Sequence, residues 1–196
     1  MPVNREAAER AIADFLRALG FDPRDRADLA ETPARVTEAY SNDLLRGYAV
    51  DIQRLLSDGS CVAPESAKSS FVAVTEIAIA TVCPHHLLPA LGIAHVVYLP
   101  GSKLLGIGTI SALVDAFARR LTLQEEIGQN VVQALITSAG ARGAYCELEL
   151  SHSCLRARGE QQSHALVRTS ARAGEYARAE ALPEIALALG RARSSS

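Results

Sequence analysis

Strand-like segments occur in two groups along the chain, and two helical segments separate the groups. Residues 71–82 are rich in β-branched side chains and partly alternate, and residues 93–99 and 103–105 continue the first group. Residues 145–150 alternate, and residues 165–171 are their expected antiparallel partner. Strands grouped in hairpins, with helices segregated between them, predict an α+β fold with an antiparallel sheet.

The helical segments show apolar residues at helical spacing. Residues 110–121 and 125–138 form the two helices between the hairpins. Residues 5–19 and about 32–45 predict an N-terminal helical extension, with Thr32 as the N-cap of the second helix. Residues 183–189 predict a short terminal helix, which is followed by an Arg/Ser tail expected to be loose.

These elements divide the chain into three expected parts. They are an N-terminal helical region (1–60), a central α+β domain (61–182) and a C-terminal short helix with its tail (183–196). Four long strands and two helices leave a sheet with open edges, which must be covered or paired. Pairing with a neighbouring subunit is one solution.

Composition excludes several classes of function. The net charge of −2 offers no basic excess for a phosphate backbone, and 5% aromatic residues without tryptophan argue against base stacking. No apolar run approaches the roughly 18 residues that span a bilayer, and the charged N-terminus does not resemble a signal peptide. We therefore expect a soluble cytoplasmic protein with no nucleic-acid or membrane partner, whose four cysteines are thiols or metal ligands.

The densest group of reactive side chains follows the first strand. Cys83 and His86 are three residues apart in a turn fixed by Pro84, so both can reach one ion, and a thiolate with an imidazole suits zinc. The alternative is a buried cysteine and two histidines that hydrogen-bond to the backbone.

A second group follows the strand at 145–150. His152 and Cys154 are two residues apart, so on a strand they face the same side. Three protein ligands with a fourth position open to water are typical of catalytic zinc. Histidines that are not ligands then transfer protons near neutral pH.

Gln124, Glu125 and Glu126 open the second helix and allow two interpretations. Acidic residues stabilise a helix N-terminus through the helix dipole. Alternatively, a carboxylate and an amide together hold a planar edge of N–H groups such as that of guanine.

Seven segments spread over most of the chain follow one family pattern. They are 31–36 (ETPARV), 83–89 (CPHHLLP), 95–100 (HVVYLP), 117–121 (FARRL), 124–125 (QE), 152–159 (HSCLRARG) and 169–170 (TS). In this order and near this spacing they resemble GTP cyclohydrolase I, an enzyme of pterin and tetrahydrofolate biosynthesis.

The resemblance implies roles for individual residues. Cys83, His86 and Cys154 match the three zinc ligands, and His85 and His152 match the acid–base histidines. Glu125, with Gln124 beside it, matches the residue that binds the guanine edge, and Arg158 matches a phosphate-binding arginine.

The resemblance also implies a fold and a reaction. The fold is the tunnelling fold, in which subunits complete a large antiparallel β-barrel, usually in a homodecamer with active sites between subunits. Water activated by Zn²⁺ attacks C8 of GTP, the imidazole ring opens, formate leaves and a dihydroneopterin-type product forms.

The segment after the first group of strands departs from the family. Gly108, Thr109 and Ala112 replace a serine, a lysine and an arginine that help to hold the triphosphate. A charge-assisted contact contributes on the order of 1.5–3 kcal/mol, so two lost contacts weaken triphosphate binding. The other basic side chains that could compensate, or could be ordinary surface charges, are Arg156, Arg168 and Arg172.

Three functions are therefore expected. The first is a zinc-dependent cyclohydrolase acting on GTP. The second keeps the hydrolytic chemistry but acts on a purine with fewer phosphates, a nucleoside or a base analogue. The third is a non-catalytic oligomeric binding protein with structural zinc.

Overall fold

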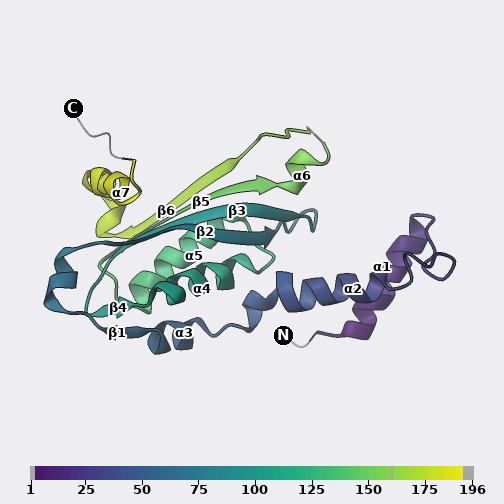
Figure 1. Cartoon of the computed structure of the whole chain (residues 1–196), viewed down its shortest axis with the longest axis horizontal. Helices are drawn as coiled ribbons and strands as arrows, with labels where there is room; N and C mark the ends of the chain where they lie inside the picture. The colour runs from purple at the N-terminus through teal and green to yellow at the C-terminus, as the bar shows by residue number, and fades with distance from the viewer. Residues whose placement is uncertain (1–2, 160, 192–196) are drawn as a thin grey trace.

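A four-stranded antiparallel sheet carries two helices on one face (Figure 1). The computed structural model describes residues 3–159 and 161–191. The strands are β1 (Ser60–Val62), β2 (Val72–Val82), β3 (Pro89–Leu99), β4 (Lys103–Leu105), β5 (Gly143–His152) and β6 (Val167–Gly174). The helices are α1 (Arg5–Ala18), α2 (Thr32–Glu38), α3 (Ile52–Asp58), α4 (Ile107–Ala118), α5 (Gln124–Thr137), α6 (Ser153–Arg156) and α7 (Leu182–Ala188).

Short turns of other helix types join these elements. They are a π-helical turn, η1 (Ala39–Leu44), and the 3₁₀ turns η2 (Arg46–Ala49), η3 (Glu65–Ser69), η4 (Glu175–Ala177) and η5 (Ala179–Ala181).

The sheet order is β2-β3-β5-β6, and each neighbouring pair is antiparallel. Alternate side chains of these strands point toward α4 and α5 and form the main core, as expected for half-buried strands. The close approach of β3 and β5 requires Gly92, because a Cβ there would lie 1.9 Å from the Glu149 carbonyl oxygen. The predicted α+β fold with antiparallel hairpins and two intervening helices is confirmed.

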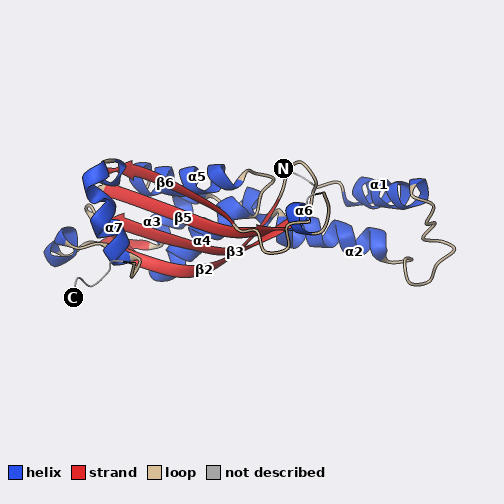
Figure 2. Cartoon of the chain, turned by 90° about the horizontal axis from the view of Figure 1, so that it is seen from above, coloured by secondary structure: helices blue, strands red, loops and turns tan. Residues whose placement is uncertain are grey.

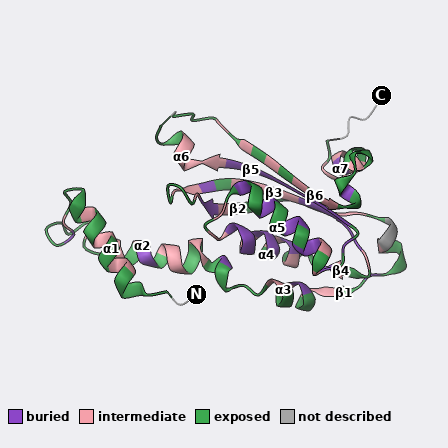
Figure 3. Cartoon of the chain, turned by 180° about the vertical axis from the view of Figure 1, so that it is seen from behind, coloured by how far each residue is buried: buried purple, intermediate pink, exposed green. Residues whose placement is uncertain are grey.

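The opposite face of the sheet is covered at one end only. A smaller apolar cluster joins Val97, Leu99 and Tyr145 of the sheet to Tyr176 and Ile185, so α7 packs there. Figure 2 shows α7 at the end of the sheet far from α1 and α2, which extend beyond the other end. No residue of α1 is buried, as its green and pink colouring in Figure 3 shows.

Several predicted boundaries are wrong by a few residues. The second helix is α-helical only to Glu38 and continues as the π-helical η1, and Glu31 rather than Thr32 occupies its N-cap. The helix expected from 110 begins at Ile107, because the chain enters it directly from β4 through the extended Gly106. The strand expected at 165–171 runs instead from Val167 to Gly174, where Gly174 pairs with Gly143.

Two features have no clear local signal in the sequence. β1 lies in a polar stretch and forms only because it pairs with β4, with Cys61 opposite Leu104. β2 contains a bulge between Val74 and Ile77, where Glu76 has a φ of 58° and its N–H donates to His95 Nδ1 at 3.4 Å. The division of the chain at residues 60 and 182 stays a prediction, and the tail at 192–196 lies outside the described residues.

Candidate metal centre

The first group of reactive side chains lies in the turn that joins β2 to β3. The Cys83 N–H donates to the Leu88 carbonyl and the Leu87 N–H donates to the Cys83 carbonyl, both at 2.9 Å. Leu87 has a φ of 54°, and the Tyr40 hydroxyl of η1 donates to its carbonyl. The turn is thus closed at its base and held from outside by the N-terminal helical region.

The second group lies at the same end of the sheet. His152 is the last residue of β5 and pairs with Ala90, which in turn pairs with Thr81 near the end of β2. Cys154 was expected on the strand beside His152, and that expectation is wrong, because residues from Ser153 onward form α6. Figure 1 shows α6 and the β2–β3 turn at the same end of the sheet.

This arrangement brings the three predicted ligands together. The Sγ atoms of Cys83 and Cys154 and a ring nitrogen of His86 all lie within 4.8 Å of one another. Cys83 Sγ is 3.7 Å from His86 Nδ1. Tetrahedral zinc with Zn–S of about 2.3 Å and Zn–N of about 2.0 Å separates its ligand atoms by roughly 3.5–3.8 Å. The three side chains therefore fit a zinc ion with small adjustments.

The thiols favour occupancy by a cation. Burial, and then the neighbouring Cys83 sulfur, raise the pKa of the Cys154 thiol, while the charge of Arg158 acts in the opposite direction. Two sulfurs this close disfavour a pair of thiolates unless a positive charge lies between them. A bound divalent ion supplies that charge and deprotonates its thiol ligands.

The two histidines that are not in the ligand group lie in different surroundings. His85 is exposed, with its Nδ1 3.8 Å from Cys83 Sγ. His152 is half-buried, and its Nε2 lies 2.8 Å from Gln124 Oε1. Burial lowers the pKa of His152, so its neutral form is favoured.

The first turn of α5 separates its acidic residues by role. Glu126 accepts hydrogen bonds from the Leu123 N–H at 3.1 Å and the Thr122 hydroxyl at 2.8 Å, so its carboxylate closes the helix N-terminus. Glu125 is exposed, and its charge acts on His152. Gln124 is only 4% exposed. The helix-stabilising interpretation therefore describes Glu126, and the Glu125 carboxylate faces solvent.

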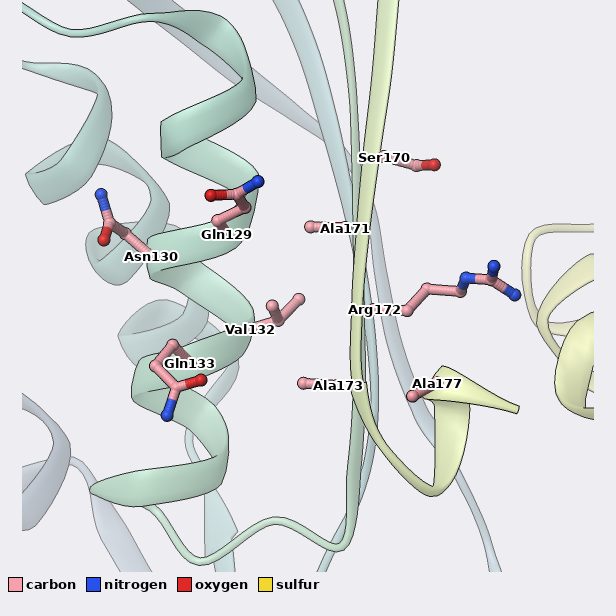
Figure 4. A pocket seen from close by; sticks show the side chains of 9 residues that line it. All are labelled: Gln129, Asn130, Val132, Gln133, Ser170, Ala171, Arg172, Ala173 and Ala177. Atoms are coloured by element: carbon pink, nitrogen blue, oxygen red, sulfur yellow. The ribbon is translucent and has the colours of Figure 1, made fainter. Parts of the chain in front are cut away.

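The arginines near the candidate centre have different partners. Arg158 is exposed after α6 and lies near Cys154. Arg156 donates to the Ser151 hydroxyl at 2.7 Å, and Arg168 forms an ion pair with Glu149. In Figure 4 the Arg172 side chain extends away from α5.

The start of α4 carries small side chains and acidic neighbours. Gly108 is exposed, and a Cβ there would have no atom within 4 Å. The Thr109 hydroxyl donates to the Gly59 carbonyl at 3.3 Å. A cavity of about 570 Å³ beside it is lined in part by Asp51 and Asp58.

A larger groove of about 690 Å³ runs between α5 and β6 (Figure 4). Gln129 and Gln133 line it from α5, and Ala171 and Ala173 line it from β6. None of the predicted metal-ligating, acid–base or guanine-binding residues lines this groove. It lies beside the sheet edge formed by β6.

Comparison with known proteins decides the family. The sequence profile described as GTP cyclohydrolase I matches residues 8–190. The chain belongs to the GTP cyclohydrolase I family. The predicted family, its tunnelling fold and an enzyme of the GTP cyclohydrolase I type are therefore confirmed.

Relatives with this name cover nearly the whole chain. GTP cyclohydrolase 1 of Leifsonia xyli subsp. xyli is 37% identical over 187 residues, which are 95% of this chain and 96% of the relative. GTP cyclohydrolase 1 of Campylobacter lari is 35% identical over 176 residues, 90% of each chain. A crystal structure of the archaeosine synthase QueF-Like in the apo form overlaps 54% of this chain and 94% of its own, with a TM-score of 0.42 and 18% identity, and adds nothing to the assignment.

No helix within the described residues has the length and apolar composition needed to cross a membrane. The expected cytoplasmic location stays a prediction.

Sequence reasoning missed two contacts of the candidate centre. Tyr40 comes from outside the predicted central domain to hold the β2–β3 turn. Gln124 contacts His152 across 28 positions of the chain. Neither spacing has a motif, because both contacts arise only when separate elements pack.

Proposed function

We propose that this chain is a zinc-dependent hydrolase that opens the imidazole ring of a guanine-type purine, with GTP as the first candidate substrate. The convergence of Cys83, His86 and Cys154 from two separate segments carries the proposal. The relatives named GTP cyclohydrolase 1 support both the reaction and the substrate.

The ligand set supports zinc in a catalytic role. The group contains three side chains, two sulfurs and one imidazole, and leaves one tetrahedral position for solvent. When bound, zinc supplies a nucleophile at neutral pH, because it lowers the pKa of coordinated water to about 7.

The remaining site residues take complementary roles in the proposal. His152 and His85 accept and donate protons at the purine ring nitrogens and the sugar oxygen. Glu125 accepts hydrogen bonds from the N–H groups of the guanine edge, for which its exposed carboxylate is suited. Arg158 contacts phosphate from the loop that follows α6.

The single chain also presents surfaces that suit assembly into a ring, such as the expected homodecamer. β2 and β6 are the two edges of the sheet, and within the described residues no other strand pairs with them on the outside. Phe15 and Leu19 of the N-terminal helical region are 60% and 56% exposed. We propose that neighbouring copies pair these edges and complete a β-barrel with sites between subunits.

The test is formate release from GTP by the zinc-loaded protein, with the same protein after chelation as the control. We expect release that stops on chelation and returns with zinc. Bound zinc without formate from any guanine compound would instead support the non-catalytic alternative, particularly if chelation unfolds the chain.

The start of α4 favours a second candidate, in which the same chemistry acts on a purine with fewer phosphates, a nucleoside or a base analogue. Gly108, Thr109 and Ala112 provide no positive charge, and Asp51 and Asp58 line the cavity beside Thr109. Carboxylates repel a triphosphate. A panel of GTP, GMP, guanosine and guanine decides the question: a much higher kcat/KM for GTP excludes this candidate.

A further inference from the structure

Gln124 is the most completely hydrogen-bonded side chain beside the candidate centre. It is the first residue of α5 and is only 4% exposed. Its Nε2 donates to the Leu148 carbonyl at 3.2 Å and to the Val167 carbonyl at 2.9 Å. Its Oε1 lies 2.8 Å from His152 Nε2. The amide therefore joins α5, β5 and β6 at the point where His152 ends its strand.

The partners fix which end of the amide is nitrogen. Carbonyl oxygens only accept hydrogen bonds, so the side of Gln124 that faces Leu148 and Val167 must be the NH₂ group. Both of its hydrogens are then used, and neither is left for a substrate. The expectation that Gln124 helps to bind a guanine edge finds no free donor here.

The same logic fixes the proton on His152. Gln124 Oε1 accepts hydrogen bonds and has none to donate, so Nε2 of His152 must carry a hydrogen. The neutral Nε2–H tautomer satisfies this contact, and so does the imidazolium ion. The Nδ1–H tautomer does not, because it would set two lone pairs against each other in a half-buried site.

We propose that Gln124 is a positioning residue that fixes the ring of His152, so that His152 gains and loses its exchangeable proton at Nδ1. This inference rests on the proposed function, in which His152 transfers protons, and it assigns the nitrogen that does so. Gln124 acts through His152 and does not touch the substrate. A purely structural role, in which Gln124 only ties the start of β6 to β5, is the alternative to be tested.

Solid-state NMR of zinc-loaded protein labelled with ¹³C and ¹⁵N at histidine reads the tautomer directly, whatever the oligomer size. The chain has five histidines, and the His152→Gln variant identifies the signal of His152. We expect the Nε2–H tautomer with an unprotonated Nδ1 at a pH where the ring is neutral. An Nδ1–H tautomer in the unmodified protein overturns the proposal, whether or not the protein turns over any purine.

Variants of Gln124 separate positioning from structural support. Gln124→Met keeps the size but removes all three hydrogen bonds, whereas Gln124→Glu keeps an acceptor for His152. We expect a mixed tautomer signal and a kcat lowered about 10- to 100-fold in Gln124→Met, with KM within about threefold, as for other partners that orient an active histidine. Gln124→Glu should restore the Nε2–H signal and most of kcat. Gln129→Met, an exposed change on the same helix, should alter neither.

Each contrary result is informative. An unchanged tautomer and kcat in Gln124→Met would leave Gln124 with a structural role only. A raised KM with unchanged kcat would return it to substrate binding. If wild-type protein shows the Nε2–H tautomer but releases no formate, the proposed function fails while the assignment of the proton stands.

Discussion

The candidate metal centre and the start of α4 differ in how far their chemistry matches the family. In the metal centre, Cys83, His86 and Cys154 match the family ligands and lie within 4.8 Å of one another. At the start of α4, Gly108 and Thr109 stand where the family has a serine and a lysine, and the hydroxyl of Thr109 is used by the Gly59 carbonyl.

The contrast suggests that bond cleavage and phosphate recognition are separable in this fold. Moving a metal ligand by 1 Å destroys coordination, so the ligands need closed turns and strand ends to hold them. Phosphate binding by exposed side chains depends mainly on charge, so it changes with single substitutions on a helix surface. The predictions below address first the centre and then the helix.

The largest effect is expected for Cys154→Ala. The remaining Cys83 and His86 are too few to hold zinc firmly, so we expect zinc content near zero and formate release reduced at least about 10³-fold. Metal analysis and a formate assay measure the two effects. Circular dichroism should remain unchanged, because Cys154 lies in the short α6 outside the core.

Cys61→Ala is the matched control, because Cys61 is an exposed thiol in β1 and is not in the ligand group. It should retain both zinc and activity. Full zinc occupancy in Cys154→Ala would contradict the ligand set and remove the contrast with α4.

The next effect is expected when positive charge is returned to α4. Thr109→Lys combined with Ala112→Arg should lower the KM for GTP about tenfold or more, since charge-assisted contacts contribute on the order of 1.5–3 kcal/mol each. The KM for guanosine should not change. Steady-state kinetics with both compounds measure the ratio.

Thr109→Gln combined with Ala112→Gln controls for side-chain size and for loss of the Thr109 hydroxyl. It should leave the KM for GTP unchanged. An equal effect in both double variants would mean that packing, and not charge, distinguishes this segment from the family.

The sequence predicted the elements better than their contacts. Alternating apolar residues predicted the strands, and the apolar faces of 110–121 and 125–138 predicted the two helices, because each pattern reflects burial along a single element. The bulge at Glu76 and the pairing of β1 with β4 depend on residues distant in the chain, and so no local pattern encodes them.

The candidate site shows the same division. Residue types and spacing were enough to predict Cys83, His86 and Cys154 as one group, because zinc needs sulfur and imidazole ligands. They did not predict that α6 replaces the end of β5 or that Gln124 holds His152. Those features follow from the packing of α5 against β5 and β6.

The smallest effect is expected for Gly108→Ala. Gly108 is the second residue of α4, its added Cβ meets no atom within 4 Å, and alanine restricts the unfolded chain more than glycine does. We expect the free energy of unfolding to rise by about 0.4–1 kcal/mol, measured by urea denaturation at a fixed protein concentration. Gly92→Ala, whose Cβ would lie 1.9 Å from the Glu149 carbonyl oxygen, should instead destabilise the fold. A loss of stability in Gly108→Ala would mean that another subunit packs against the start of α4, and the open helix surface seen in one chain would then be an interface.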